Sequence, residues 1–235
     1  MHEDKKVLEG YSDREKGAYL GAIASIATAD REATPEELDY ISGLCDAADI
    51  SETQKQAVLR SATDLSGKEL TECLDVLKNS ELRYPLITDL MAFAKTDDTY
   101  SEEEEENIHN IAEYLNVNQQ QFSLLDEFAD KAVTTRAPSE EIAQPGFLSS
   151  VGLKEKLDNA GINGSSLLKG LISIAGPMIL SGMLSKGLGG RRAPGTGGGL
   201  LGGGLGSLIG MLSGGRGFGS TGGLLGRVLG RGGHF

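Results

Sequence analysis

The chain has 235 residues, a formal net charge of −12, 34 glycines and 2 cysteines, a length that allows one large domain or two small ones. Residues 1–144 carry 32 acidic and 13 basic side chains, a net charge of −19, whereas residues 145–235 carry 2 and 9, a net charge of +7. This split predicts an acidic globular part followed by a basic, glycine-rich tail. The acidic part argues against nucleic-acid binding and favours metal cations or basic partners.

Cysteine usage and the N-terminal residues both predict a cytoplasmic protein. Cys45 and Cys73 follow no CxxC pattern and lie in apolar helical stretches, so we expect buried free thiols in a reducing compartment. The first six residues lack the apolar core of a secretion signal.

Seven helices and no strand are predicted between residues 12 and 132, which makes the fold class all-α. Most helix starts carry a capping box, in which a Ser, Thr or Asn and a Glu or Gln three residues later satisfy each other's free backbone amides. The pairs are Ser12/Glu15, Thr34/Glu37, Ser51/Gln54, Ser66/Glu69, Ser101/Glu104 and Asn118/Gln121. One further helix is predicted at 80–95, where Pro85 falls near the first turn, a position that tolerates proline. Apolar residues at helical spacing support each helix.

An acidic segment occurs twice in the chain, at positions 30–37 and again at 97–104. Each copy follows an apolar helical stretch and opens a new helix with the frame Asp-x-x-x-(Thr/Ser)-x-(Glu)-Glu. The two copies are 67 residues apart, a separation that we call the repeat offset. Apolar positions such as Ile41 and Ile108 are separated by the same offset. The pattern predicts two pseudo-repeated halves of three helices, with the fourth helix as their connector.

Six acidic side chains at these two helix entrances form a candidate metal site. Hard divalent cations such as calcium or manganese bind several converging oxygens, and the candidate ligands are Asp30, Glu32, Glu37, Asp97, Asp98 and Glu104. A capping role is the alternative, because the positive end of the helix dipole favours acids in the first turn. An EF-hand is excluded, since the twelfth position from each leading Asp is isoleucine rather than glutamate.

The paired entrances also resemble a family signature. Ala29-Asp30-x-Glu32-Ala33-Thr34-x-x-Glu37 and Thr96-Asp97-x-Thr99-Tyr100-Ser101-x-x-Glu104 resemble the A-D-G-x-hydrophobic-S/T-x-x-E signature of the TerB tellurite-resistance family, although Arg31 and Asp98 replace its glycine. The resemblance covers roughly residues 12–132. It implies an all-α domain of about seven helices in two halves, metal binding by the acidic entrances, and a role in stress or metal response, including tellurite resistance, at the cytoplasmic side of the membrane.

The remaining chain is predicted to be of a different kind. Residues 134–146 contain two prolines and no apolar period, which indicates a linker between a domain at 1–133 and a tail at 147–235. A short amphipathic helix is expected at 147–159. The apolar segment 170–185 holds 16 uncharged residues, fewer than the roughly 20 that span a bilayer.

Glycines recur at every fourth position in the last part of the tail, at Gly202, Gly206, Gly210 and Gly214. This spacing gives a smooth helix face for close packing in lipid, whereas so much glycine disfavours a helix in water. The tail is therefore predicted to be largely disordered in water or associated with a membrane.

No enzyme is predicted, because the chain lacks a nucleophile–base signature, and its glycines are not followed by the G-K-[ST] of a phosphate loop. We expect a non-enzymatic domain that binds a divalent cation or a protein partner and needs no organic cofactor. The tail would attach it to an anionic membrane or a membrane protein at the inner (cytoplasmic) membrane, or drive self-association. The alternative is a structural scaffold whose glycine-rich tail oligomerises or docks in a larger complex.

Overall fold

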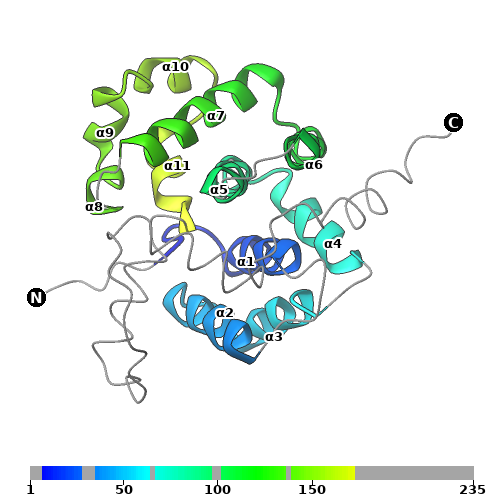
Figure 1. Cartoon of the computed structure of the whole chain (residues 1–235). Coiled ribbons are helices and arrows are strands. Elements are labelled where there is room, and N and C mark those ends of the chain that lie inside the picture. Colours follow the sequence, from blue (N-terminus) through cyan, green and yellow to red (C-terminus); the bar gives the residue numbers. More distant parts are fainter. Residues whose placement is uncertain (1–6, 28–34, 64–66, 97–101, 136–138, 173–235) are drawn as a thin grey trace, which may run out of the picture.

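A computed structural model describes residues 7–27, 35–63, 67–96, 102–135 and 139–172, and the described residues form helices and no strand (Figure 1). The predicted all-α class is confirmed. The first seven helices are α1 (Asp13–Ala27), α2 (Pro35–Ala47), α3 (Glu52–Ser61), α4 (Lys68–Leu77), α5 (Arg83–Thr96), α6 (Glu102–Tyr114) and α7 (Gln119–Thr134). Four short helices follow: α8 (Ser139–Ile142), α9 (Pro145–Ser150), α10 (Lys154–Asn159) and α11 (Gly164–Gly170).

The backbone confirms the predicted repeat. Helices α2 and α6 begin and end one repeat offset apart, and α3 and α7 begin one repeat offset apart. The turn between each pair has its left-handed residue at the same offset, Asp49 with φ 53° and Asn116 with φ 58°. Beyond these residues the amide of Ile50 donates to the carbonyl of Cys45, and the amide of Val117 donates to that of Ala112. Both helices therefore end in the same Schellman-type turn.

The sequence signals for helix starts are largely confirmed. The Ser51 side chain accepts from the amide of Gln54, and Asn118 and Gln121 form a reciprocal capping box. Helices α2 and α6 begin at the residues that follow Thr34 and Ser101, as predicted. The start of α4 differs by one residue, because Gly67, with φ 76°, is the residue that precedes the helix rather than Ser66.

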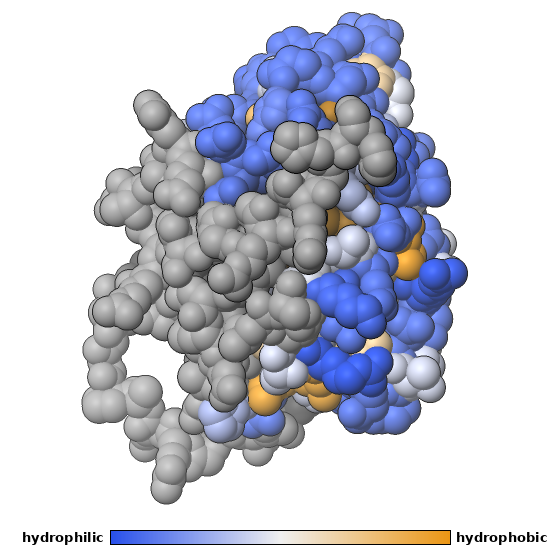
Figure 2. Space-filling view, turned by 90° about the vertical axis from the view of Figure 1, so that its right-hand side faces the viewer, coloured by the Kyte–Doolittle hydropathy of each residue, from blue (hydrophilic) through white to orange (hydrophobic). Residues whose placement is uncertain are grey.

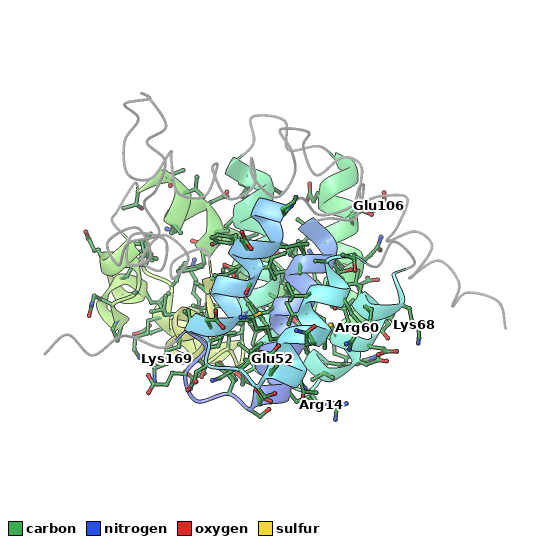
Figure 3. The ribbon with its side chains drawn as sticks, turned by 90° about the horizontal axis from the view of Figure 1, so that it is seen from below. Arg14, Glu52, Arg60, Lys68, Glu106 and Lys169 are labelled. Carbon is green, nitrogen blue, oxygen red and sulfur yellow. The ribbon has the colours of Figure 1, made fainter. Side chains whose placement is uncertain are left out.

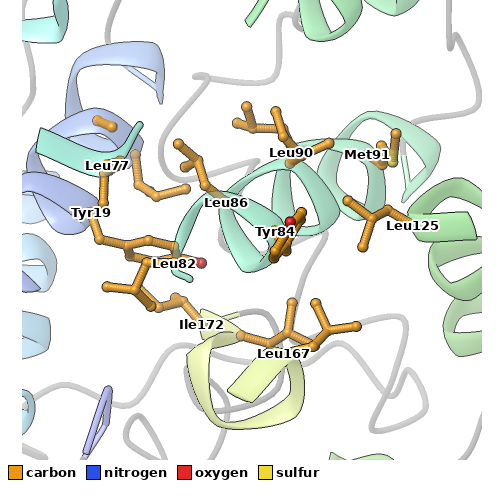
Figure 4. Packing of buried hydrophobic residues seen from close by; sticks show 14 of the residues in the cluster. Tyr19, Leu77, Leu82, Tyr84, Leu86, Leu90, Met91, Leu125, Leu167 and Ile172 are labelled. Carbon is orange, nitrogen blue, oxygen red and sulfur yellow. The ribbon is translucent and has the colours of Figure 1, made fainter. Parts of the chain in front are cut away.

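Helices α1 and α5 lie at the centre of the molecule (Figure 1). Helix α1 packs against α3 and α4, whereas α5 packs against α6, α7 and α11. One continuous apolar core joins both groups, and Figure 4 shows its part around α5. The largest fully buried side chains include Tyr19, Leu70, Leu74, Leu82, Leu86, Ile87, Leu90, Met91, Ile108 and Phe128.

The helical body extends to Ile172, beyond the domain end predicted at residue 133. Helices α8 and α9 begin within the stretch predicted as a linker, where Pro145 is the first residue of α9 rather than a break. The expected helix at 147–159 is wrong, because Gly152, with φ 72°, separates α9 from α10. Apolar side chains of residues 139–172 join the main core: Ile142, Phe147, Leu148, Leu153, Leu157, Ile162, Leu167, Leu168, Leu171 and Ile172.

The expected apolar segment 170–185 is described only at its first three residues, which are buried, and the rest lies outside the described residues. Within the described ranges, no helix has both the length and the apolar character needed to cross a membrane. Figure 2 shows one face of the molecule, on which the described surface is mainly hydrophilic with small, separate apolar spots. Both cysteines are free, and burial raises the pKa of the Cys45 and Cys73 thiols to about 12.

Candidate functional site

The six predicted metal ligands fall at the edges of what the structure describes. Asp30 and Glu32 lie within residues 28–34, and Asp97 and Asp98 lie within 97–101, so all four are outside the described residues. Glu37 and Glu104 are the third residues of α2 and α6, but their side chains are outside the description. Among the side chains that are described, no group of three or more His, Cys, Asp or Glu could hold a metal ion. The metal site therefore stays a prediction.

The described backbone nevertheless places Glu37 and Glu104 at equivalent positions of α2 and α6. The third helical position is where a capping-box acid reaches back to the free amides of the first turn, and it also lies at the positive end of the helix dipole. Exposed acids continue from each entrance, at Asp39 on α2 and at Glu105 and Glu106 on α6. Asp39 and Glu106 are themselves related by the repeat offset, and Figure 3 labels Glu106 at the rim of the molecule.

A buried polar group recurs one turn inside each entrance helix. Tyr40 on α2 and Asn107 on α6 occupy positions related by the repeat offset. Among the described groups, the Tyr40 hydroxyl and the Asn107 amide nitrogen are buried and have no hydrogen-bond partner. Burial raises the pKa of Tyr40, and the negative charge of Asp89 raises it further. The repeat thus extends to buried polar side-chain groups of α2 and α6.

Asp89 is the functional candidate that the sequence reasoning missed. It lies on α5 and is fully buried, with 0% of its surface exposed. Its Oδ2 atom accepts hydrogen bonds from the Tyr19 hydroxyl at 2.5 Å and from the backbone amide of Ile172 at 2.8 Å. Burial and the Asp89 charge together raise the pKa of Tyr19 well above its usual range. The signal was present in the sequence, since Asp89 is the one acid within the apolar run 86–91.

A second polar junction joins α5, α7 and α10. The side-chain amide nitrogen of Gln121 donates to the Tyr84 hydroxyl at 3.1 Å and to the carbonyl oxygen of Ala160 at 3.0 Å. The same Gln121 side chain accepts from the backbone amide of Asn118 in the capping box. A helix-start residue therefore also fixes the segment after α7 onto the second half.

These features define a class of protein: an all-α domain built from two pseudo-repeated three-helix units, in each of which an acidic segment leads into the second helix. The family model described as "Tellurite resistance protein TerB" matches residues 16–127, so this stretch of the chain is a domain of the TerB family. The match begins in α1 and ends in α7, so α8–α11 lie outside it. Comparison with curated proteins and with solved structures found no match.

Proposed function

We propose that the chain is a non-enzymatic tellurite-resistance or stress-response protein whose paired acidic entrances bind a divalent cation, and through it or beside it a protein partner. The observation that carries this proposal is the TerB-family match across both entrances. Carboxylates are the donors that hard cations such as calcium and manganese prefer, and each entrance supplies three. No organic cofactor is proposed.

The repeat adds a second line of support. Equal spacing of α2 and α6 puts Glu37 and Glu104 at the same helical position, so both entrances would present acids in the same way. The surrounding charge also favours cations, because residues 1–144 carry a net charge of −19. A capping role for Glu37 and Glu104 is compatible with this function, since Asp30, Glu32, Asp97 and Asp98 are left for the cation.

Calorimetric titration of the full-length chain with manganese or calcium tests the cation proposal. The double variant Asp30→Ala/Asp97→Ala should lose the binding heat, because it removes the leading acid of each entrance. A matched control is Asp39→Ala/Glu106→Ala, which removes the same charge from exposed, repeat-related positions just beyond the entrances. Equal heats for both double variants, or no heat for the unaltered chain, would contradict the proposal.

The tail is proposed to bring this domain to an anionic membrane, or to a membrane protein, at the cytoplasmic face of the inner membrane. It has a net positive charge and an apolar segment at 170–185, which suits such a surface. The full chain should sediment with anionic vesicles, whereas a chain that ends at Gly176 should stay in the supernatant. If light scattering instead shows a defined oligomer without lipid that this truncation abolishes, the scaffold function is favoured.

A further inference from the structure

Leu171 and Ile172, which follow α11 and lead into the glycine-rich part of the chain, are buried in the helical body. Helix α11 ends at Gly170, and the backbone then turns so that the Ile172 amide donates to Oδ2 of Asp89, 83 residues earlier in the chain. The Tyr19 hydroxyl of α1 donates to the same oxygen, so one carboxylate joins α1, α5 and the start of the tail. Figure 4 shows Ile172 and Tyr19 beside Leu82, next to α5.

The three groups of this anchor are withdrawn from water. Exposure is 0% for Tyr19 and Asp89 and 1% for Ile172. A carboxylate in such surroundings depends on each donor that it keeps, because a lost hydrogen bond is not replaced by water while the site stays closed. Loss of the Ile172 amide therefore favours opening of the site to solvent.

Close packing accompanies this hydrogen bond. A side chain added at Gly170 would meet Pro85 and Leu82 of the α5 region at 2.4–3.1 Å, so α11 approaches that region more closely than a larger residue permits. The Tyr11 hydroxyl also donates to the Ser166 carbonyl of α11 at 3.3 Å. Four buried apolar side chains, Leu167, Leu168, Leu171 and Ile172, complete the docked segment.

We propose that Asp89 is a latch that holds residues 164–172 in a docked state, and that these residues undock together when the Ile172 hydrogen bond is lost. Docking controls whether the apolar residues 167–172 are withdrawn from solvent. The uncharged sequence that follows them, 173–185, has 13 residues and is by itself too short for a membrane span. Undocking adds 167–172 and gives a stretch of 19 residues that contains one charge, Lys169, close to the roughly 20 residues that a span needs. The last step rests on the proposed membrane role of the tail.

The latch itself is tested without lipid by limited trypsin digestion of the full-length chain. Lys169 is exposed but lies on α11 (Figure 3), so cleavage there requires α11 to open, and Lys131 on α7 reports opening of the body. Ile172→Pro removes the amide donor, and the preceding Leu171 already has the extended conformation (φ −76°, ψ 116°) that proline demands. Ile172→Ala is its matched control, since it removes the side chain but keeps the amide.

Cleavage at Lys169 should be at least about tenfold faster in Ile172→Pro than in Ile172→Ala, with cleavage at Lys131 unchanged. The reason is that the lost hydrogen bond joins the Ile172 amide to a carboxylate, and hydrogen bonds to charged groups are stronger than those between neutral groups. Equal rates for the two variants would overturn the latch. Asp89→Asn, which removes the charge, should also accelerate cleavage relative to Asp130→Asn on the surface; equal effects of these two would count against it as well.

Sedimentation with anionic vesicles separates the latch from the membrane role. If Ile172→Pro is retained more strongly than Ile172→Ala, both proposals are supported. If it is cleaved faster at Lys169 yet no variant binds vesicles, the latch stands and the membrane function of the tail fails.

Discussion

The two halves of the domain share helix starts and turns but differ in what covers their central helix. In the first half α1 is covered by α3 and α4, and Gly21 lets them approach closely, since a side chain there would meet Cys73 Sγ at 2.8 Å and Ser61 Oγ at 3.1 Å. In the second half α5 is covered by α6, α7 and α11. There Phe128 of α7 occupies the position that corresponds to Ser61, and its ring packs edge-on against Phe147 of α9. Duplicated local signals therefore coexist with two different solutions for burying the core.

Phe128→Ala removes the contact between α7 and α9 in the second half and should reduce the stability of the fold more than the other substitutions below. The side chain is 1% exposed and holds α7 against the segment that begins at α9, so its loss leaves a cavity costing about 3–5 kcal/mol of unfolding free energy. Urea denaturation of the full-length chain measures this cost. A loss below about 1 kcal/mol would mean that α9 does not pack on α7 as described.

Gly21→Ala tests the close approach in the first half, with a smaller effect. Overpacking costs typically about 1–3 kcal/mol, and the gain in helix propensity of about 1 kcal/mol offsets part of it, so a net loss of about 1 kcal/mol is expected. Gly146→Ala on α9 is the matched control, because nothing lies within 4 Å of an added side chain there, and it should leave stability unchanged or higher. Equal thermal midpoints for the two variants would contradict the close approach.

The shared helix starts are tested by Ser51→Ala and Asn118→Ala, which remove equivalent caps of α3 and α7. Each should cost about 1 kcal/mol. Ser51 should cost more, since its hydroxyl also donates to Asp13 Oδ2 at 2.7 Å and ties α3 to α1. Urea denaturation compares both with Ser123→Ala, an exposed position within α7 that should change stability little. A larger loss for Asn118 would reverse the order that the two contacts predict.

The smallest effect is expected from the exposed ion pair between Lys156 of α10 and Glu127 of α7, at 3.0 Å. The hydrogen bond and charge of Lys156 lower the pKa of Glu127, so the pair stabilises the fold above the unfolded pKa of that carboxyl and loses its effect as the pH falls through the folded pKa. Lys156→Ala should cost less than about 0.5 kcal/mol at neutral pH and nothing in acid. The measurement is the difference in thermal midpoint between Lys156→Ala and the unaltered chain, at neutral pH and at a pH below the folded pKa of Glu127.

Much of the fold could be predicted because its signals are local. Capping pairs such as Asn118/Gln121 predict the starts of α1, α2, α3, α6 and α7, and that of α4 to within one residue. Helix α5, predicted without a capping pair at 80–95, begins at Arg83. The repeat offset relates the two halves. The extent of the domain could not be predicted in this way, because α8–α11 are short and depend on packing against α5 and α7. Pro145 suggested a linker when read alone, yet in the fold it is the first residue of α9, and Gly152 divides the stretch predicted as one helix into α9 and α10.

The candidate sites divide along the same line. The acidic entrances are recognisable because Asp30 and Asp97 recur in one frame at one offset. Asp89 has no such local pattern, and its importance comes from Tyr19 and Ile172, which are 70 and 83 residues away in the chain. A lone acid within an apolar helical run is nonetheless a signal, because burial of a carboxylate requires donors.

The central functional claim is that both halves carry a cation site at their acidic entrance, and paramagnetic broadening by manganese tests it most directly. In amide NMR spectra of the full-length chain, substoichiometric manganese should broaden residues 30–37 and 97–104 and the first turns of α2 and α6 before any others. Asp30→Ala should remove only the first set, and Asp97→Ala only the second. Broadening spread evenly over exposed acids such as Asp46 and Glu113, or no broadening, would contradict the claim.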